Sequence, residues 1–425
     1  MNSAKSFCPF DSDPRRDESN PMEHGLPTPK APSRAVNSVS TGELQRRWAA
    51  VRREMRSRDI DALVIQNSSD WVGGYIRWFS NQPATNGYSS SVVFPIDGGM
   101  SLIEQGPFDG CRRAGDLEVS ATGIAQRLTT PSYPSVHYTG RYDADLAARE
   151  LSRLGVKRVG LVAPGAMYHS FGERLVQSMA GIDVVDATDF VDRIKAVKSA
   201  EERGLIRQVA AMQDEVMARV REFVRPGLKD FEIAAYAQYA GQQLGSEQGI
   251  FLCSSAPLGQ AASFRPRSLQ GRTLERGDVY SLLVENNGAG GYYTELSRMF
   301  VLGKIPPELS DAHAAVIDAQ RFALSLLKPG AAAADIFSRH NEYLRRVGLP
   351  EERRLSVHGM GYDMVERPLI RQDEDMVIAE DMAIVCHPGI LNERMFVHNT
   401  EVYLIEAHGP SDSLHRTPKQ IFEIN

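Results

Sequence analysis

The stretch VHGMGYDMVERP, residues 357–368, holds the residue types in this chain that are most able to do chemistry. His358 precedes a Gly-x-Gly turn, and Asp363, Glu366 and Arg367 follow it. An imidazole can bind a metal ion or move a proton, because its pKa lies near neutral pH. We therefore keep three interpretations for His358: a metal ligand, an acid–base catalyst, and a buried structural histidine.

Two further residues can join His358 in one site. His387 precedes a proline in the segment CHPG, and Glu295 lies in YYTELSR. Two imidazoles and one carboxylate form a mixed nitrogen and oxygen donor set that suits a single zinc, iron or manganese ion. Without a metal, the two histidines could act as general acid and base. A hydrogen-bonded structural histidine is the third interpretation of His387, and all three stay open.

Glu285 and Glu295 lie on the two strands of a predicted hairpin, GDVYSLLVENNGAGGYYTELSRMFVLG, which turns at a Gly-rich segment. Paired carboxyl groups in a cavity raise one pKa, which suits a proton carrier near neutral pH. Glu401, on the last predicted strand, is a candidate partner in the same site. A salt-bridged or solvated face is the alternative for Glu285, and Arg298 could simply pair with Glu295.

Charged and aromatic residues near these groups are candidates for binding the substrate. Arg367 could hold a substrate carboxylate through two parallel hydrogen bonds, and Arg298 is the second candidate for that role. Asp363 and Glu366 could contribute to the same pocket, although an internal ion pair between Glu366 and Arg367 explains them equally well. Tyr293 lies in the hairpin, where packing is the alternative to a substrate contact.

The elements that must position these residues form two regions after a terminal arm. With 425 residues, the chain is long enough for two domains. Residues 1–38 are rich in Pro, Ser and Asp without periodicity, which predicts a flexible arm. Helix and strand patterns alternate over residues 39–195, as in an α/β domain. Residues 196–425 then begin with a capping box, Ser199 and Glu202, ahead of a long amphipathic helix.

Composition limits the classes of function. A net charge of −6, with 42% hydrophobic and 24% charged residues, is typical of a globular protein and gives no basic surface for nucleic acid. Four widely spaced cysteines indicate neither a disulfide framework nor a zinc ribbon, which favours a reducing compartment. No apolar run approaches the ~20 residues of a membrane span, and the amino terminus lacks a signal-peptide core. We therefore expect a cytoplasmic protein that acts on a small molecule.

The order of motifs resembles the pita-bread superfamily of methionine aminopeptidase, aminopeptidase P, prolidase and creatinase. Its marks here are RIKAVKSAEE before the long helix, the RPG turn, LSRMF at the end of the hairpin, the HGMG turn and HPG. Each motif is short, and their order over about residues 40–410 makes them specific. The resemblance implies a mixed α/β (α+β) architecture, with an amino-terminal creatinase-like α/β domain followed by a carboxy-terminal pita-bread domain.

In the peptidases, this resemblance implies five metal ligands: two aspartates on the hairpin, one histidine and two later glutamates. At those positions, in order, this chain carries Val284 or Glu285, Glu295, His358, His387, and Asn399 or, as second choice, His398. At most one ligand is retained in kind. A second histidine, which steadies the scissile bond in peptidases, is replaced by Val365. Because donor type and geometry determine metal binding, we expect neither a dinuclear centre nor a peptidase.

Creatinase is the metal-free relative, and the GYYT segment of the hairpin resembles it, although its catalytic groups are not matched here. Our leading hypothesis is a metal-independent hydrolase or lyase without a cofactor. It would cleave a C–N or other C–X bond in a small polar, carboxylate-bearing substrate by His/Glu acid–base chemistry. The alternatives are a lyase or hydrolase with one metal ion, as in dimethylsulfoniopropionate lyases, and an Xaa-Pro metallopeptidase. A catalytically inactive binding module is the non-enzymatic alternative.

In dimeric relatives, the amino-terminal domain of one subunit closes the site of the other. By this resemblance, we expect a homodimer in which the loop 69–88 brings Trp71, Arg77 and Trp78 to the partner's pocket. Arg77 would bind an anion there, since guanidinium suits carboxylates and phosphates. A domain-interface patch is the alternative for these side chains. Neither nucleic acid nor a membrane is expected as a partner.

Overall fold

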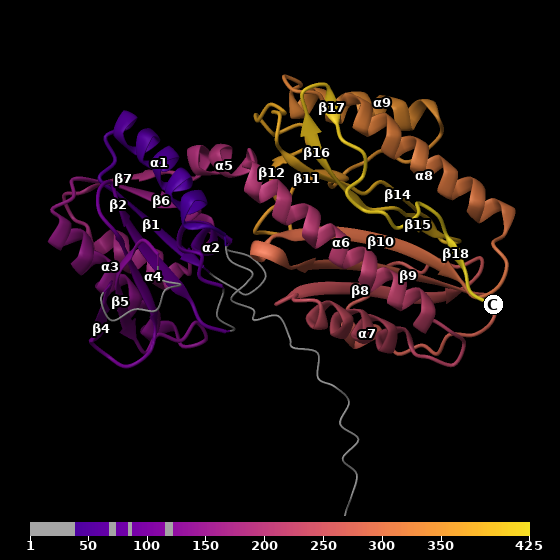
Figure 1. The fold of residues 1–425 in the computed structure, drawn as a ribbon, viewed down its shortest axis with the longest axis horizontal. Coiled ribbons are helices and arrows are strands. Elements are labelled where there is room, and N and C mark those ends of the chain that lie inside the picture. Colours follow the sequence, from indigo (N-terminus) through magenta and orange to yellow (C-terminus); the bar gives the residue numbers. More distant parts are fainter. Residues whose placement is uncertain (1–38, 68–73, 84–86, 115–121) are drawn as a thin grey trace, which may run out of the picture. The chain divides into compact units, whose positions relative to one another are not determined.

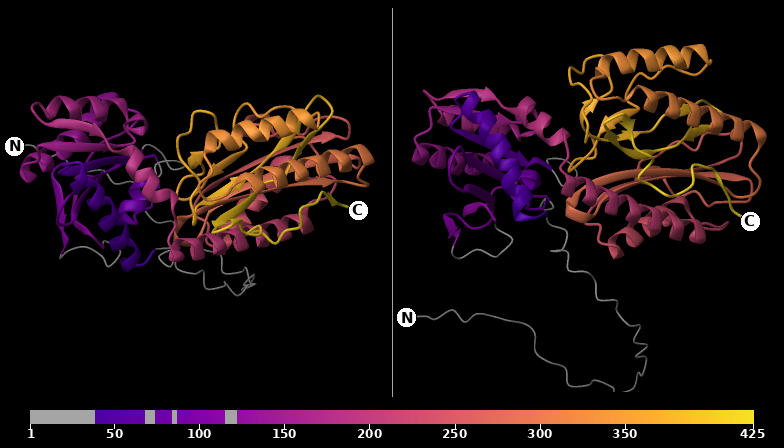
Figure 2. Two further views of the ribbon diagram at one scale, coloured as in Figure 1. Left: turned by 90° about the horizontal axis from the view of Figure 1, so that it is seen from above. Right: turned by 45° about the horizontal axis from the view of Figure 1, so that its top comes forward.

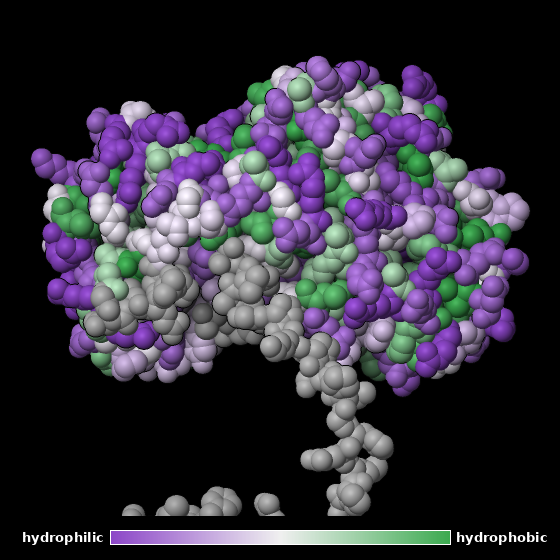
Figure 3. Space-filling view, viewed as in Figure 1, coloured by the Kyte–Doolittle hydropathy of each residue, from purple (hydrophilic) through white to green (hydrophobic). Residues whose placement is uncertain are grey.

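The structure, a computed structural model, describes residues 39–67, 74–83, 87–114 and 122–425, all of which belong to one compact unit. The arm predicted over residues 1–38, and Trp71, lie outside this described part. None of the helices in the described ranges is long and apolar enough to cross a membrane. The face seen in Figure 3 is mainly hydrophilic, with its hydrophobic residues scattered.

A seven-stranded mixed sheet forms the first part of the chain (Figure 1), with the strand order β4-β5-β3-β2-β1-β6-β7. Its strands are β1 (Ala62–Asn67), β2 (Ser90–Pro95), β3 (Met100–Gln105), β4 (Gly110–Arg113), β5 (Ile124–Thr130), β6 (Arg158–Val162) and β7 (Asp183–Asp186). The central strand β1 is almost wholly apolar because both of its faces are buried. Leu63 and Ile65 pack in one hydrophobic cluster and Val64 in another.

Five helices accompany this sheet: α1 (Thr41–Ser57), α2 (Gly74–Ser80), α3 (Gly140–Leu154), α4 (His169–Ser178) and α5 (Thr188–Ala196). Ser40 caps α1, because its hydroxyl accepts a hydrogen bond from the backbone N–H of Glu43 at 3.1 Å. The helix α2 corrects the prediction of a loop over residues 69–88. Its apolar side chains, Ile76 and Phe79 among them, are buried in the core, and this packing stabilises a short helix.

A four-stranded sheet, ordered β18-β10-β9-β8, begins the second part of the chain. It consists of β8 (Gly249–Pro257), β9 (Asp278–Asn287), β10 (Tyr293–Val301) and β18 (Phe422–Glu423). The helices α6 (Ala200–Phe223) and α7 (Asp230–Gln243) lie alongside it (Figure 1). Their apolar side chains pack against Leu282, Val284 and Leu296, so this face of the sheet is covered. The predicted hairpin is confirmed as β9 and β10.

A five-stranded sheet follows, ordered β12-β11-β13-β16-β17. Its strands are β11 (Val357–Gly359), β12 (Glu366–Leu369), β13 (Ala383–Cys386), β16 (Glu401–Glu406) and β17 (Gly409–Pro410), with the separate pair β14 (Gly389–Leu391) and β15 (Phe396–His398). The helices α8 (Pro307–Leu326) and α9 (Ala333–Arg346) pack on the outer face of this sheet (Figure 2). Helices therefore cover one face of each of these two sheets in the second part of the chain, and the opposite faces are left to build a site.

Helix ends follow the sequence signals with one exception. The capping box of α6 is present, since Ser199 and Glu202 each accept a hydrogen bond from the other's backbone N–H. Gly348, at φ 74°, follows the end of α9. Gly330 does not close α8 in the same way, because that helix already ends at Leu326. Pro329 restricts the backbone of the residue before it to extended conformations, which stops the helix early.

The fully buried guanidinium of Arg47 joins distant parts of the chain. It donates hydrogen bonds to Glu43 at 2.7 Å, to Glu202 at 3.0 Å and to the hydroxyl of Tyr292 at 2.7 Å. It also donates to the hydroxyl of Tyr362 at 3.3 Å. These partners belong to α1, to α6, to the tip of the hairpin and to the turn after His358. A buried charge is tolerated only when it is paired in this way.

Replacing Arg47 by methionine should destabilise the protein by about 3–5 kcal/mol, because two buried carboxylates lose their main counter-charge. The midpoint of urea denaturation measures this loss. Arg46→Met is the matched control, since Arg46 pairs with the same two glutamates while its side chain is 42% exposed. It should cost no more than about 1 kcal/mol. Equal losses in the two variants would contradict the role given to Arg47.

Candidate active site

The two carboxyl groups of the hairpin face the same way. Glu285 on β9 and Glu295 on β10 are register partners, as are their neighbours Val284 and Leu296. Because successive side chains of a strand point to opposite faces, the two glutamates share one face, and Val284 and Leu296 pack under α6 and α7 on the other. Of the two residues proposed for the first ligand position, the structure therefore puts Glu285 on the face of Glu295.

The two histidines come from neighbouring strands of the second sheet. His358 lies on β11, which pairs with β13, and His387 directly follows β13. The backbone N–H of His387 donates to the carbonyl oxygen of Ser356 at 2.8 Å, which continues the pairing. The imidazole rings lie with their centroids 5.1 Å apart at 60°. Gly359 permits this arrangement, since a Cβ there would collide with the backbone of Arg367 on β12.

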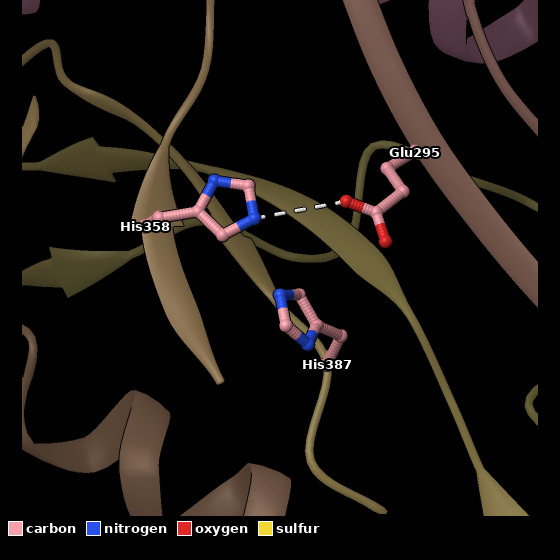
Figure 4. A group of neighbouring side chains, drawn as sticks. All are labelled: Glu295, His358 and His387. Carbon is pink, nitrogen blue, oxygen red and sulfur yellow. Dashed lines mark ion pairs between the residues drawn. The ribbon is translucent and has the colours of Figure 1, made fainter. Parts of the chain in front are cut away.

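Glu295, His358 and His387 form one cluster, and their side chains point toward one another (Figure 4). One nitrogen or oxygen atom from each lies within 4.8 Å of the others. Nε2 of His358 is 3.7 Å from Oε2 of Glu295. Both side chains are buried. Within the described part of the chain, no other group of three histidine, cysteine or acidic side chains converges in this way. The structure thus brings together the three residues proposed from the sequence as metal ligands.

Burial controls the charge of this cluster. Burial, with a smaller effect of His387, lowers the pKa of His358 to about 3, and burial lowers the pKa of His387 to about 4. Burial raises the pKa of Glu295, and burial together with the neighbouring Glu295 raises the pKa of Glu285. Neutral imidazoles and protonated carboxyl groups are therefore favoured without a cation, so the 3.7 Å contact is not an ion pair at neutral pH.

The tautomer of His358 is fixed by the backbone. Its Nδ1–H donates to the carbonyl oxygen of Gly359 at 2.8 Å, so Nε2 carries the lone pair that faces Glu295. Metal-binding histidines commonly donate their other ring nitrogen to a carbonyl oxygen in this way. A lone pair opposite a carboxyl group also requires either a shared proton or a cation between them. This geometry fits one divalent transition ion.

The donor atoms do not fit a two-metal centre of the peptidase type. Asn399, at the last ligand position, donates its amide to Gln320 on α8 at 3.2 Å. Glu401 pairs with the buried guanidinium of Arg298 and accepts a hydrogen bond from Ser413. Neither side chain joins the cluster of three. The donors therefore fit one ion rather than two.

Arg298 does not pair with Glu295, which corrects one expectation. All five of its N–H groups have protein acceptors: the carboxylate of Glu401 and the carbonyl oxygens of Ser297, Thr400, Thr417 and Pro418. Because these donors are occupied, the structure contradicts a substrate-binding role for Arg298. It likewise removes Glu401 as a catalytic partner, since that carboxylate serves as the counter-charge of the arginine.

The residues after the histidine turn form internal ion pairs. Glu366 pairs with Lys198 at 3.0 Å and with Lys195 at 3.3 Å, and Asp363 pairs with Lys195 at 3.4 Å. Arg367 donates to a different set of carboxylates, those of Asp189, Glu374 and Asp375. These ion pairs are the alternative that the sequence already offered for Asp363 and Glu366, and the carboxylate-binding role of Arg367 stays a prediction. Their lysine partners lie more than 160 residues away in sequence, which no local pattern could reveal.

The structure also describes three other residues that were predicted to line the pocket: Trp78, Arg77 and Tyr293. Trp78 is 1% exposed and lies beneath the guanidinium of Arg47, so it is a core residue and not a pocket residue. Arg77 forms an ion pair with Glu247 of its own chain, while its predicted contact with a partner subunit stays a prediction. Tyr293 lies on β10 two residues before Glu295, on the same face, and keeps its candidate role.

Two residues near the cluster were missed or ranked low from the sequence. Arg354 is exposed, and its positive charge lowers the pKa of the three cluster residues and of Glu285, although burial has the larger effect on each. Among the described residues, none accepts a hydrogen bond from its guanidinium.

His398, rather than Asn399, faces β10, with Nδ1 2.7 Å from the hydroxyl of Ser297. Because successive side chains point to opposite faces, only one of His398 and Asn399 can face β10.

Comparisons with known proteins agree with this architecture. Residues 204–407 match the model of metallopeptidase family M24. A probable dipeptidase PepE of Mycobacterium bovis is 26% identical over 246 residues, covering 57% of this chain and 65% of that protein. An Xaa-Pro dipeptidase of Pyrococcus horikoshii is 24% identical, covering 63% and 75%. The solved X-Pro aminopeptidase of Thermotoga maritima matches with a TM-score of 0.71 at 20% identity, covering 89% of this chain and 99% of that one.

The fold is therefore the pita-bread fold preceded by an α/β domain, as predicted. The match over residues 204–407 and the dipeptidase relatives support membership of the M24-like superfamily. It spans about two thirds, 65%, of the length of the PepE protein that it matches. The names of these relatives lean against our expectation that the chain is not a peptidase.

The acid sensitivity of the metal-free protein should reveal the buried state of His387. Its folded-state pKa of about 4 lies below the ordinary value of 6.5, so its stabilising contribution is present above pH 6.5 and is lost as the pH falls toward 4. Between pH 7 and 5 this amounts to about 2 kcal/mol. In the presence of a chelator, His387→Gln should therefore lose less stability than the wild type over this range, as measured by urea denaturation.

The exposed His408 supplies the control for this measurement. His408→Gln should follow the wild type at both pH values. If His387→Gln and the wild type lost equal stability between pH 7 and 5, the imidazole of His387 would not be held neutral by burial.

Proposed function

We propose that this protein is a hydrolase of the M24-like superfamily that carries one divalent transition ion at Glu295, His358 and His387. It would cleave a C–N bond in a small, carboxylate-bearing substrate, a class that includes dipeptides. The observation that carries the proposal is the convergence of three ligand atoms within 4.8 Å in a buried site. The fixed tautomer of His358 and the peptidase names of the relatives support it.

In the proposed hydrolysis, the bound ion and individual residues of the chain would have separate roles. When bound, the ion supplies Lewis-acid chemistry at the scissile carbonyl. Glu285, directly opposite Glu295, stays outside the set of three ligands. Burial raises its pKa, and with a cation bound beside it the group would be ionised and could take a proton from the attacking water and pass it to the departing nitrogen. The backbone carbonyl of Gly359 keeps Nε2 of His358 directed into the site.

Arg354 is the group best placed to orient the substrate carboxylate. Arg298 and Arg367, the two candidates from the sequence, are occupied by internal acceptors. Arg354 lies two residues before Ser356, whose carbonyl oxygen holds the backbone of His387. An exposed guanidinium near a buried site can bind a carboxylate with two hydrogen bonds. We therefore assign to Arg354 the role first expected of Arg367.

Metal-independent acid–base chemistry, our leading hypothesis from the sequence, uses the same residues and stays a prediction. The raised pKa values of Glu285 and Glu295 favour it as the second candidate, because a carboxyl group that titrates above its usual range can carry a proton at neutral pH. Elimination by a lyase also stays a prediction. The presence of a bound ion separates the two leading functions.

Protein equilibrated with zinc or manganese and then desalted should retain about one ion per chain, measured by elemental analysis. His358→Asn and His387→Gln should each lose that ion, since two donors bind a transition metal weakly. His408→Gln, an exposed control, should retain it. Two ions per chain would contradict the single-ion site. No ion, with hydrolysis surviving a chelator, would instead establish the metal-independent alternative.

Arg354→Ala should raise KM for L-alanyl-L-alanine by about tenfold or more, because a hydrogen bond to a charged group contributes about 1.5–3 kcal/mol. The value for L-alanyl-L-alaninamide, which lacks the carboxylate, should change little. Arg353→Ala removes the adjacent exposed arginine and is the matched control. Equal changes in KM for both variants would exclude this role for Arg354. If the metal-loaded protein hydrolysed no dipeptide, the proposed substrate class would be wrong.

A further inference from the structure

His398 forms a third imidazole on the face that carries the cluster. It ends β15, and its ring packs against Phe264 and Phe396, with centroid distances of 5.0 and 4.7 Å. The side chain is 5% exposed. Its Nδ1 lies 2.7 Å from the hydroxyl of Ser297, which follows Glu295 by two residues on β10 and so shares its face. Two aromatic rings and one hydrogen bond therefore fix the orientation of this imidazole.

The other ring nitrogen of His398 is left without a partner. The hydroxyl of Ser297 donates to Thr400 at 2.8 Å, so its oxygen can accept the Nδ1–H of His398. Nε2 then carries a lone pair. Among the residues that the structure describes, none forms a hydrogen bond to this buried nitrogen. A buried acceptor that stays unpaired is destabilising, so such atoms in folded proteins generally bind water or a ligand.

Two serine hydroxyls extend this polar surface. Ser254 on β8 and Ser281 on β9 are register partners. Ser281 precedes Glu285 by four residues, so both serines lie on the face of the two glutamates. Within the described ranges, neither buried hydroxyl has a hydrogen-bond partner. Nε2 of His398 and the hydroxyls of Ser254 and Ser281 are thus buried polar groups without hydrogen-bond partners on the inner face of this sheet, the face that carries Glu285 and Glu295.

We propose that Nε2 of His398 accepts a hydrogen bond from an N–H group of the substrate, beside the Glu295, His358 and His387 cluster. The inference rests on the proposed function, since it assumes that the substrate binds at this cluster. A protonated amine and an amide N–H are both N–H donors, and a dipeptide carries both. Burial lowers the pKa of His398 to about 3, which keeps the ring neutral and able to accept. Phe264 and Phe396 hold the acceptor in place before the substrate arrives.

Binding to the metal-free protein tests this role without depending on turnover. In the presence of a chelator, calorimetry would give the Kd of L-alanyl-L-alanine for the wild type and two variants. His398→Asn keeps an amide at the position of Nδ1 and removes the acceptor at Nε2. It should weaken binding about fivefold or more, as expected for one lost hydrogen bond. His398→Gln places an amide oxygen near the position of Nε2 and should bind within about twofold of the wild type.

Two derivatives identify which N–H group is bound. N-acetyl-L-alanyl-L-alanine lacks the protonated amine, and L-alanyl-sarcosine lacks the amide N–H. The derivative without the recognised group should bind the wild type and His398→Asn equally weakly, because the hydrogen bond is absent in both complexes. The other derivative should still distinguish the two proteins. This pattern would identify the group that His398 binds.

The remaining outcomes overturn the inference. Equal Kd values of L-alanyl-L-alanine for the wild type and His398→Asn would do so, and so would a wild type that binds none of the three compounds. If His398→Asn melts well below the wild type, Ser297→Ala replaces it. That variant keeps the ring but removes the acceptor that fixes its tautomer, and it should weaken binding about twofold to threefold, whereas unchanged binding would refute the inference. Zinc content is measured separately, so a chain that binds dipeptide through His398 without any zinc would refute the proposed function alone.

Discussion

The pairing of Glu285 with Glu295 across β9 and β10 sets the electrostatic problem on which the site depends. Both carboxyl groups are buried on one face, where an isolated negative charge is strongly disfavoured. Within the described chain, no lysine or arginine forms an ion pair with either group. The neighbouring imidazoles of His358 and His387 are themselves held neutral by burial. These carboxyl groups therefore stay protonated unless a cation compensates their charge.

Several other buried charges in the described part of the chain are paired with partners of opposite charge. Arg47 is surrounded by two glutamates, Lys195 and Lys198 by Asp363 and Glu366, and Arg298 by Glu401. Each set joins segments that are distant in sequence, so these ion pairs hold the framework together. Glu285 and Glu295 differ from these groups because neither forms an ion pair with a lysine or arginine of the described chain, and the proposed function assigns the compensating charge to a bound ion. The same physical rule thus separates structural charges from functional ones.

The superfamily architecture is retained here while the ligand set is altered. The hairpin, the histidine turn and the strand before Pro388 occupy the places that the fold gives them. At these places, however, the later carboxylate positions carry His387 and Asn399, and Asn399 turns toward α8. A change from carboxylate to imidazole lowers the negative charge of the site and favours one transition ion over two hard-ligand ions. The same backbone can thus support a different metal chemistry.

The sequence by itself determined the order of elements and the residue types of the cluster. The cap at Ser40, the capping box of α6 and the Gly-rich hairpin are local patterns, because hydrogen bonds within a few residues decide them. His358, His387 and Glu295 could be named as a set because ordered motifs carry them. Only the tertiary structure decided which charges stay available for chemistry. A partner 103 residues away occupied Arg298, and Arg367 pairs with the distant Asp189 as well as with the nearby Glu374. Strand alternation turned His398 inward and Asn399 outward. Which ion pairs form, and which side chains point into the site, depend on contacts between distant segments. Spacing along the chain does not encode these contacts.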